Sequence, residues 1–205
     1  MTERHAERGS YHHGALPEAL VEAALALLDE EGPGRVTMRE VARRAGVSAG
    51  APFRHFADRQ ALLTEVAARV LADFERWQLA QIEASEGTAM RAIGLGFVRY
   101  AIHHPHRFEL VRSRVFTASR QPELQERLSG IDEAFTGFIV ADQQAGQLRP
   151  GDPALVGLAG QALVYGLAQM IIDGYLPLDR AEELTAQVLD TFGQGIANRP
   201  DPDRP

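Results

Sequence analysis

The stretch TMREVARRAGVSAGAPFRHF, residues 37–56, decides the fold, because it has the pattern of two short helices joined by a tight turn. Thr37 and Glu40 have the spacing of a capping box, in which a threonine side chain caps the start of a helix. Gly46 can adopt the backbone angles that a sharp turn requires, and Ser48 can cap a second helix. The stretch therefore predicts a helix-turn-helix, the arrangement that lays a second helix in the major groove of DNA.

The segments on either side of this motif also have helical patterns. Pro17 suits the first turn of a helix that Gly32 ends, and Asp58 can cap a further helix. Beyond that helix, apolar spacing and Pro or Gly breaks predict five more helices, at about 88–104, 106–116, 122–144, 153–175 and 179–197. We therefore predict an all-α protein of about nine helices, with a three-helix DNA-binding domain over residues 1–60 and a helical bundle over residues 61–205.

Charge is distributed unevenly along the 205 residues. The whole chain carries a net charge of −7, yet residues 35–60 hold six arginines against two acidic residues. Because DNA binding needs a local basic surface rather than a positive total, this distribution is compatible with DNA binding. The chain has no cysteine for a disulfide, no N-terminal run typical of a signal peptide and no 18-residue apolar run that fits a membrane span. We therefore expect a soluble, cytoplasmic protein.

Residues 15–62 resemble the N-terminal domain of the TetR (tetracycline-repressor-type) family of bacterial transcription regulators. The similar segments are ALPEALVEAALALLDEEG, TMREVARRAGVS, FRHF and DRQALL. The run SYHHG, residues 10–14, resembles the start of one subgroup that carries a Trp-His-Gly-like motif near its C-terminus. Val164-Tyr165-Gly166 stands at that place and lacks both the Trp and the His. The resemblance implies a ligand-responsive regulator, usually a repressor, that binds a near-palindromic double-stranded DNA operator as a homodimer.

The residues of the second helix that are expected to face DNA are small or weakly polar: Ser48, Ala49, Gly50, Pro52, Phe53 and His55. Because alanine and glycine carry little hydrogen-bonding information, we expect base contacts from Arg39 and Arg54. The resemblance implies phosphate contacts by Thr37, Ser48, Phe53, His55 and Arg59. Pro52 conflicts with a helix interior, so the second helix must begin within about three residues of it. For Arg43 and Arg44, a solvated helix face is as consistent with the sequence as DNA contact. For residues 1–13, a solvated tail is likewise as consistent as a basic arm that reaches DNA.

Large apolar residues are frequent in the second domain. A set of them is expected to line a pocket for a small apolar or aromatic ligand, because such ligands bind between bundled helices: Phe97, Tyr100, Phe108, Phe138, Tyr165 and Met170. Each residue alone is consistent with ordinary core. Arg99, Arg112 and Asp173 are the charged candidates for holding a single polar or anionic group of the ligand.

The last two helices are the expected dimer interface. The resemblance favours contacts between these helices of each subunit, through Gly160, Leu163, Leu184, Val188, Leu189 and Phe192. A glycine inside a helix costs about 1 kcal/mol relative to alanine, and close helix packing would offset that cost. Tight packing within one subunit is the alternative explanation for the same residues.

Other classes of function are less consistent with the sequence. A small-molecule-binding or interaction protein that keeps the helix-turn-helix without a specific operator is the alternative. The chain has no nucleophile elbow, P-loop, dinucleotide fingerprint or HExxH motif, so an enzyme is not expected. His103, His104 and His106 lie close in sequence, but Pro105 interrupts the helix between them. We therefore expect neither a metal site nor a cofactor.

Overall fold

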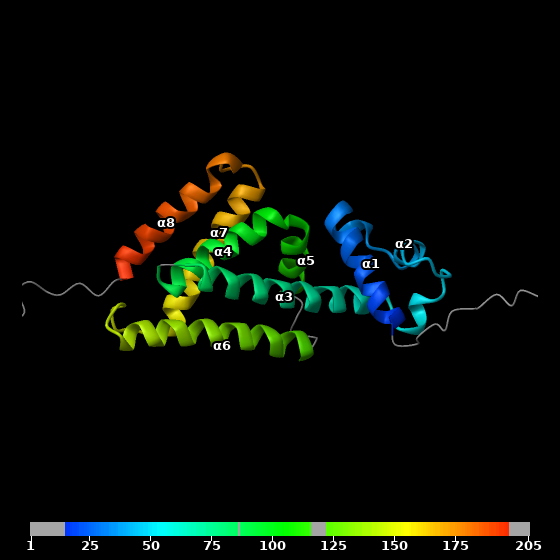
Figure 1. Cartoon of the computed structure of the whole chain (residues 1–205), viewed down its shortest axis with the longest axis horizontal. Coiled ribbons are helices and arrows are strands. Elements are labelled where there is room, and N and C mark those ends of the chain that lie inside the picture. Colours follow the sequence, from blue (N-terminus) through cyan, green and yellow to red (C-terminus); the bar gives the residue numbers. More distant parts are fainter. Residues whose placement is uncertain (1–14, 86, 116–121, 197–205) are drawn as a thin grey trace, which may run out of the picture. The chain divides into compact units, whose positions relative to one another are not determined.

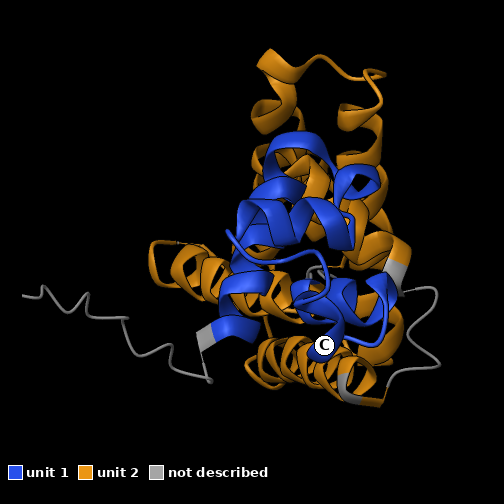
Figure 2. Cartoon of the chain, turned by 90° about the vertical axis from the view of Figure 1, so that its right-hand side faces the viewer, with its two compact units in different colours: residues 1–66 blue, residues 67–205 orange. Residues whose placement is uncertain are grey.

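The computed structural model of the chain describes residues 15–85, 87–115 and 122–196, and these residues are mostly helical, without a β-strand (Figure 1). The predicted all-α class is confirmed. The chain divides into two compact units, unit 1 (Met1–Val66) and unit 2 (Ala67–Pro205), as Figure 2 shows. The division falls within helix α3 (Arg59–Glu83), a few residues after the expected domain boundary. The basic arm and the SYHHG run lie outside the described residues.

Unit 1 contains helices α1 (Ala15–Glu31) and α2 (Met38–Arg44) and the first turns of α3, with short 3-10 helices η1 (Pro33–Arg35) and η2 (Pro52–Arg54) between them. Gly32, with a φ of 80°, ends α1 as predicted, and its N–H donates to the Leu28 carbonyl at 2.9 Å. The core is apolar and fully buried; among its residues are Leu20, Leu27, Leu28, Val36, Val41, Leu62 and Val66. These helices bring one face each to a common core.

Unit 2 contains the rest of α3 and five further α-helices: α4 (Ala89–His103), α5 (Pro105–Val115), α6 (Pro122–Gln144), α7 (Pro153–Ile172) and α8 (Ala181–Ile196). These bounds agree with the predicted helices to within a few residues. Helix α4 contacts α5, α6, α7 and α8, so it is the central element of the unit. The main apolar cluster joins α4, α7 and α8 and includes Leu95, Val98, Val164, Leu167, Ile171 and Leu189.

The contact between α4 and α8 depends on a glycine. A Cβ atom added at Gly94 would lie 2.8 Å from Leu189 Cδ2 and 3.4 Å from Val164 Cγ1. Because real Cβ atoms do not approach other atoms to 2.8 Å, only glycine allows the two helices to approach this closely without a shift of Leu189.

Helix α7 differs from one expectation of the sequence. Its 20 residues include no charged side chain, and an 18-residue window within it has a mean hydropathy of 1.7, so by length and composition α7 could cross a membrane. The expectation that no such run exists was wrong, because Gly160, Gln161 and Gln169 interrupt the apolar residues without lowering the average enough. One such helix is weak evidence for a membrane span, and part of α7 belongs to the core of unit 2.

Candidate functional site

Helix α2 is capped at both ends by side chains and backbone of its own segment. Thr37 Oγ1 accepts a hydrogen bond from the Glu40 N–H at 3.2 Å, as the capping-box spacing predicts. At the other end, Gly46 has a φ of 69°, and its N–H donates to the Arg43 carbonyl at 3.2 Å. The Val47 N–H donates to the Ala42 carbonyl at 3.0 Å. The predicted turn after α2 is therefore confirmed, with glycine in the left-handed region where other residues are strained.

The second helix of the motif is shorter than predicted. Only η2, a three-residue 3-10 helix, follows the turn, and Ala51 rather than Ser48 holds its N-cap position. The predicted α-helix from Ser48 was wrong because Pro52 has no N–H to donate and Gly50 is a poor helix former. The chain instead makes tight turns, with the Ala51 N–H donating to the Ser48 carbonyl at 2.9 Å.

Most of the residues expected to contact DNA lie on the surface of unit 1: Thr37, Arg39, Ser48, Ala49, Gly50, Phe53, Arg54 and His55. Phe53 is 57 % exposed, which is unusual for a large apolar side chain. Two residues are placed differently. Pro52, the first residue of η2, is buried, at odds with the expectation that it faces DNA. Arg59 is half-buried, and its guanidinium donates to the Val36 carbonyl at 2.6 Å and to the Pro33 carbonyl. The side chain that was expected to contact a DNA phosphate is therefore bound to these two backbone carbonyls.

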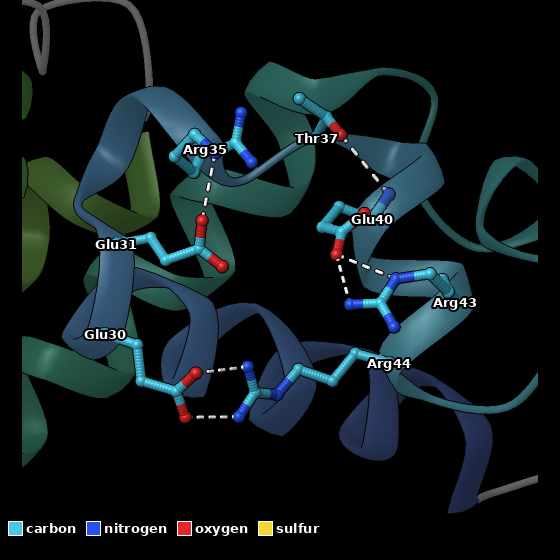
Figure 3. A network of polar contacts seen from close by, with 7 residues as sticks. All are labelled: Glu30, Glu31, Arg35, Thr37, Glu40, Arg43 and Arg44. Atoms are coloured by element: carbon cyan, nitrogen blue, oxygen red, sulfur yellow. Dashed lines mark hydrogen bonds and ion pairs between the residues drawn. The ribbon is translucent and has the colours of Figure 1, made fainter.

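Three more arginines around the motif are bound by carboxylates of unit 1, as Figure 3 shows. Arg44 of α2 donates two hydrogen bonds to Glu30 of α1, one of them at 2.6 Å, and so joins the two helices. The Arg44 hydrogen bond lowers the pKa of the Glu30 carboxyl below its ordinary value, despite a smaller opposing effect of burial. Arg43 binds Glu40 at 2.8 Å with the same effect on the Glu40 pKa. Arg35 binds Glu31 at 3.0 Å.

Arg39 and Arg54 are different from these four arginines. Neither makes a hydrogen bond or an ion pair with any residue that the structure describes, and both are exposed. They are also the two arginines expected to contact bases. Of the six arginines in residues 35–60, Arg39 of α2 and Arg54 of η2 are therefore the two without a hydrogen bond or ion pair to a described residue.

Unit 2 contains a cavity of about 1210 Å³ between α3, α4, α5, α6, α7 and α8. Five of the six residues expected in a pocket line it: Phe97, Tyr100, Phe108, Phe138 and Tyr165. Met170 does not line it and is 44 % exposed. It follows Tyr165 by five residues, a rotation of about 140° around the helix, so it lies on the opposite side of α7. Of the charged candidates, Arg112 lines the cavity, whereas Arg99 binds Glu182 elsewhere.

Two ion pairs join helices at the cavity wall. Arg91 of α4 binds Asp190 of α8 at 2.6 and 3.2 Å, and its hydrogen bond lowers the pKa of Asp190 below the ordinary value. Arg127 of α6 binds Glu75 of α3 through two contacts of 3.0 Å. Sequence reasoning missed both pairs, because their partners are 99 and 52 residues apart and no local spacing connects them.

The cavity wall is otherwise mostly aromatic and aliphatic. Phe97 contacts Phe108 with ring centroids 5.8 Å apart, and Tyr165 contacts Phe108 at 5.4 Å. Burial raises the pKa of the Tyr165 hydroxyl, and the positive charge of Arg112 opposes that effect. Burial also raises the pKa of two aspartates of α6 at the wall, Asp132 and Asp142.

The residues expected at a dimer interface are buried or partly buried within one subunit. Leu189 is 8 % exposed and belongs to the main apolar cluster, and Leu163 and Val188 pack against that cluster. Gly160 and Phe192 line the cavity, and Leu184 is half-buried. Packing within the subunit thus accounts for Leu189, whereas the other five residues are only partly buried. Another part of α7 is exposed instead, with Leu155 at 64 % and Leu158 at 61 %.

The histidines after α4 do not converge on one point. His103 Nδ1 lies 2.7 Å from the Arg99 carbonyl, the His104 ring packs against Tyr100, and His106 Nδ1 lies 4.0 Å from Glu109. Within residues 15–85, 87–115 and 122–196, no group of three or more His, Asp or Glu residues is arranged to hold a metal ion.

Known proteins resemble both units of the chain. Residues 20–66 match the profile described as "Bacterial regulatory proteins, tetR family", and residues 90–192 match the "Tetracyclin repressor-like, C-terminal domain". The HTH-type transcriptional regulator BetI of Agrobacterium fabrum is 39 % identical over 70 residues, which are 34 % of each chain. The match thus spans about a third of that curated relative.

Solved structures share the fold over nearly the whole chain. A protein of unknown function from Rhodococcus sp. RHA1 has a TM-score of 0.83 and 27 % identity, covering 93 % of this chain and 100 % of that one. The ketosteroid transcriptional regulator KstR2 of Mycobacterium tuberculosis has a TM-score of 0.66 and 18 % identity, covering 94 % and 100 %, and shares the fold alone. The second family profile alone matches half of the residues of this chain. The chain therefore belongs to the tetR family of bacterial regulatory proteins and is a DNA-binding transcriptional regulator.

Proposed function

We propose that the protein is a ligand-responsive repressor, which binds a near-palindromic operator as a homodimer and releases it when a small, mostly apolar ligand occupies the cavity of unit 2. The cavity of about 1210 Å³ is the observation that carries the ligand response. Six helices contribute to its wall, so an occupant contacts nearly every element of the unit. The protein has one conformation that fits the operator and one that does not. The ligand releases DNA only if its affinity for the second conformation is higher than its affinity for the first.

The DNA contacts that we propose follow from exposure and pairing in unit 1. Arg39 and Arg54 are exposed and uncommitted, so they are the candidates for hydrogen bonds to guanine edges. Thr37, Ser48 and His55 are exposed, and we propose that they contact phosphates, while Ala49 and Phe53 make apolar contacts with thymine methyl groups. Arg59 has a structural role in this proposal, since it binds the carbonyls that precede α2.

The homodimer that we propose forms through the exposed part of α7. Leu155, Leu158 and Met170 are large apolar side chains with 64, 61 and 44 % exposure, and Tyr175, after the helix, is 79 % exposed. Soluble monomers rarely expose apolar patches of this kind without a partner. Family likeness in residues 90–192 supports a second copy of the chain as that partner. A two-fold axis between the copies would present the two η2 segments to successive half-sites.

Footprinting on the DNA upstream of the protein's own gene tests the proposal. We expect protection of a near-palindrome whose half-sites are about one helical turn, roughly 34–36 Å, apart. Arg39→Ala should weaken operator binding about tenfold or more, since one base contact is worth about 1–3 kcal/mol. Arg43→Ala is the matched control, because Arg43 lies on the same helix but is bound by Glu40. Equal affinity for unrelated DNA would instead favour a small-molecule-binding protein without a specific operator.

A further inference from the structure

One hydroxyl group in the cavity of unit 2 has no hydrogen-bond partner among the residues that the structure describes. Tyr165 Oη is buried, and it makes no hydrogen bond with any residue that the structure describes. The Tyr165 ring is held between aromatic neighbours, 5.4 Å from Phe108 and 6.3 Å from Phe97, measured between ring centroids. Leaving a buried hydroxyl unpaired is unfavourable, so this position favours an occupant that supplies an acceptor.

A positive charge acts on the same hydroxyl. Arg112 of α5 lines the cavity, and its charge lowers the pKa of Tyr165 against the larger, opposite effect of burial. Arg112 makes no ion pair within the part of the chain that the structure describes, whereas Arg91 and Arg127, the other arginines of the wall, bind Asp190 and Glu75. A hydroxyl donor and an uncommitted guanidinium therefore act on one part of the cavity. Together they favour an oxygen that carries negative charge.

The remaining polar groups of the wall are less suited to define the ligand. Gln78 Oε1 is also unpaired, but a Cβ atom added at Gly96 would lie 2.3 Å from it, so it packs against the backbone of α4 with no room for a ligand atom. Asp132 of α6 is exposed, as Arg112 is, and Asp142 is half-buried, but neither carboxyl group is among the charges that act on the Tyr165 hydroxyl. They would favour an amine, which is the competing ligand class.

We infer that the cavity binds an apolar carboxylic acid, whose carboxylate accepts the Tyr165 hydroxyl proton in a hydrogen bond and pairs with Arg112. The apolar body of the acid contacts the rings of Phe97 and Phe108, which adjoin Tyr165. This inference rests on the proposed function, because it identifies the chemical class of the ligand for the same cavity. A mostly apolar wall, on which Arg112 is the arginine without an ion pair among the described residues, matches a ligand that has a single anionic group.

Three probes with the same ten-carbon chain test the inference: decanoate, decan-1-ol and decylamine. Each is titrated into the full-length protein without DNA by isothermal calorimetry, below its micelle concentration. We expect decanoate to bind about tenfold or more tightly than either other probe, because a charge-assisted hydrogen bond is stronger than a neutral one. In Tyr165→Phe and in Arg112→Met, the preference for decanoate over decan-1-ol should fall to about twofold or less.

Tyr100→Phe is the matched control. Tyr100 lines the same cavity, but its hydroxyl already donates to the Val70 carbonyl at 3.4 Å, so this variant should keep the preference for decanoate. Tyr165→Phe should also unfold at a temperature no lower than the unchanged protein, since the lost hydroxyl had no partner. That result separates a loss of binding from a loss of folding.

The outcomes separate this inference from the proposed function. Tightest binding of decylamine, binding of none of the probes, or an unchanged preference in both variants would overturn the carboxylic acid assignment. A gel shift with operator DNA then reports on the proposed function. If decanoate binds through Tyr165 and Arg112 but leaves the operator bound, the inference stands and ligand-induced release fails. If another compound releases the operator while decanoate does not bind, release stands and the inference fails.

Discussion

The two units of this protein differ in how their polar side chains are satisfied. In unit 1, four arginines around α2 are held by carboxylates or backbone carbonyls of the same unit, and the core beneath them is fully buried. In unit 2, ion pairs join helices at the wall of a large cavity, while the Tyr165 hydroxyl at that cavity has no described partner. Unit 1 therefore holds these polar groups with its own residues, whereas unit 2 leaves a buried hydroxyl at its cavity without a partner among the described residues.

The largest effects are expected in α7 and α8 of unit 2. Leu189→Arg would place a charge in the main apolar cluster, so unit 2 should lose its cooperative unfolding transition by circular dichroism. Leu158→Arg changes a side chain that is 61 % exposed, so the chain should stay helical but sediment as a monomer and lose operator affinity. A folded Leu189→Arg protein would show that unit 2 is not held together by this cluster. A Leu158→Arg protein that remains dimeric would place the interface elsewhere.

A smaller effect should distinguish the arginines of unit 1. Arg59→Met removes the half-buried donor to the Val36 and Pro33 carbonyls, so it should lower the free energy of unfolding by about 1–3 kcal/mol in urea. Arg39→Met removes an exposed, uncommitted side chain, so it should change stability by less than about 0.5 kcal/mol while weakening operator binding. The reverse pattern would mean that Arg59, rather than Arg39, is available for DNA.

The smallest effect concerns the ion pair between α4 and α8. Arg91 lowers the pKa of the Asp190 carboxyl, so the pair contributes stability above the unfolded-state pKa and loses it as the pH falls through the folded-state value. Both side chains are substantially exposed, so Asp190→Asn should cost only about 0.2–1 kcal/mol at pH 7. The difference in melting temperature between the unchanged protein and the Asp190→Asn variant should shrink below about pH 4. A constant difference down to pH 3 would mean that the ionised carboxylate is not its source.

The sequence predicted best those features that depend on neighbouring residues. Helix bounds, the Thr37 cap and the Gly46 turn follow from local spacing and backbone preference, and the structure confirms them. The second helix of the motif is shorter than predicted because Gly50 and Pro52 together oppose the α-helix that a cap at Ser48 would begin.

Features that depend on distant residues were predicted less well. Apolar character alone cannot tell a cavity wall from an outer surface, so Met170 was grouped with Tyr165 although it lies on the other side of α7. The expected interface residue Leu189 proved to be core, because its position depends on how α8 packs against α4. The pairing of Arg91 with Asp190 likewise exists only once the chain has folded.

Gly94 has a consequence for how this sequence can change over generations. Every other amino acid would bring a Cβ atom to within 2.8 Å of Leu189, so a single substitution at position 94 requires the partner side chain or helix α8 to move. A smaller residue at position 189 would remove the obstacle, but on its own it would leave a gap in the apolar cluster. We therefore expect a larger residue at position 94 to be tolerated best together with a smaller one at position 189, so descendants of this chain should vary at the two positions in concert.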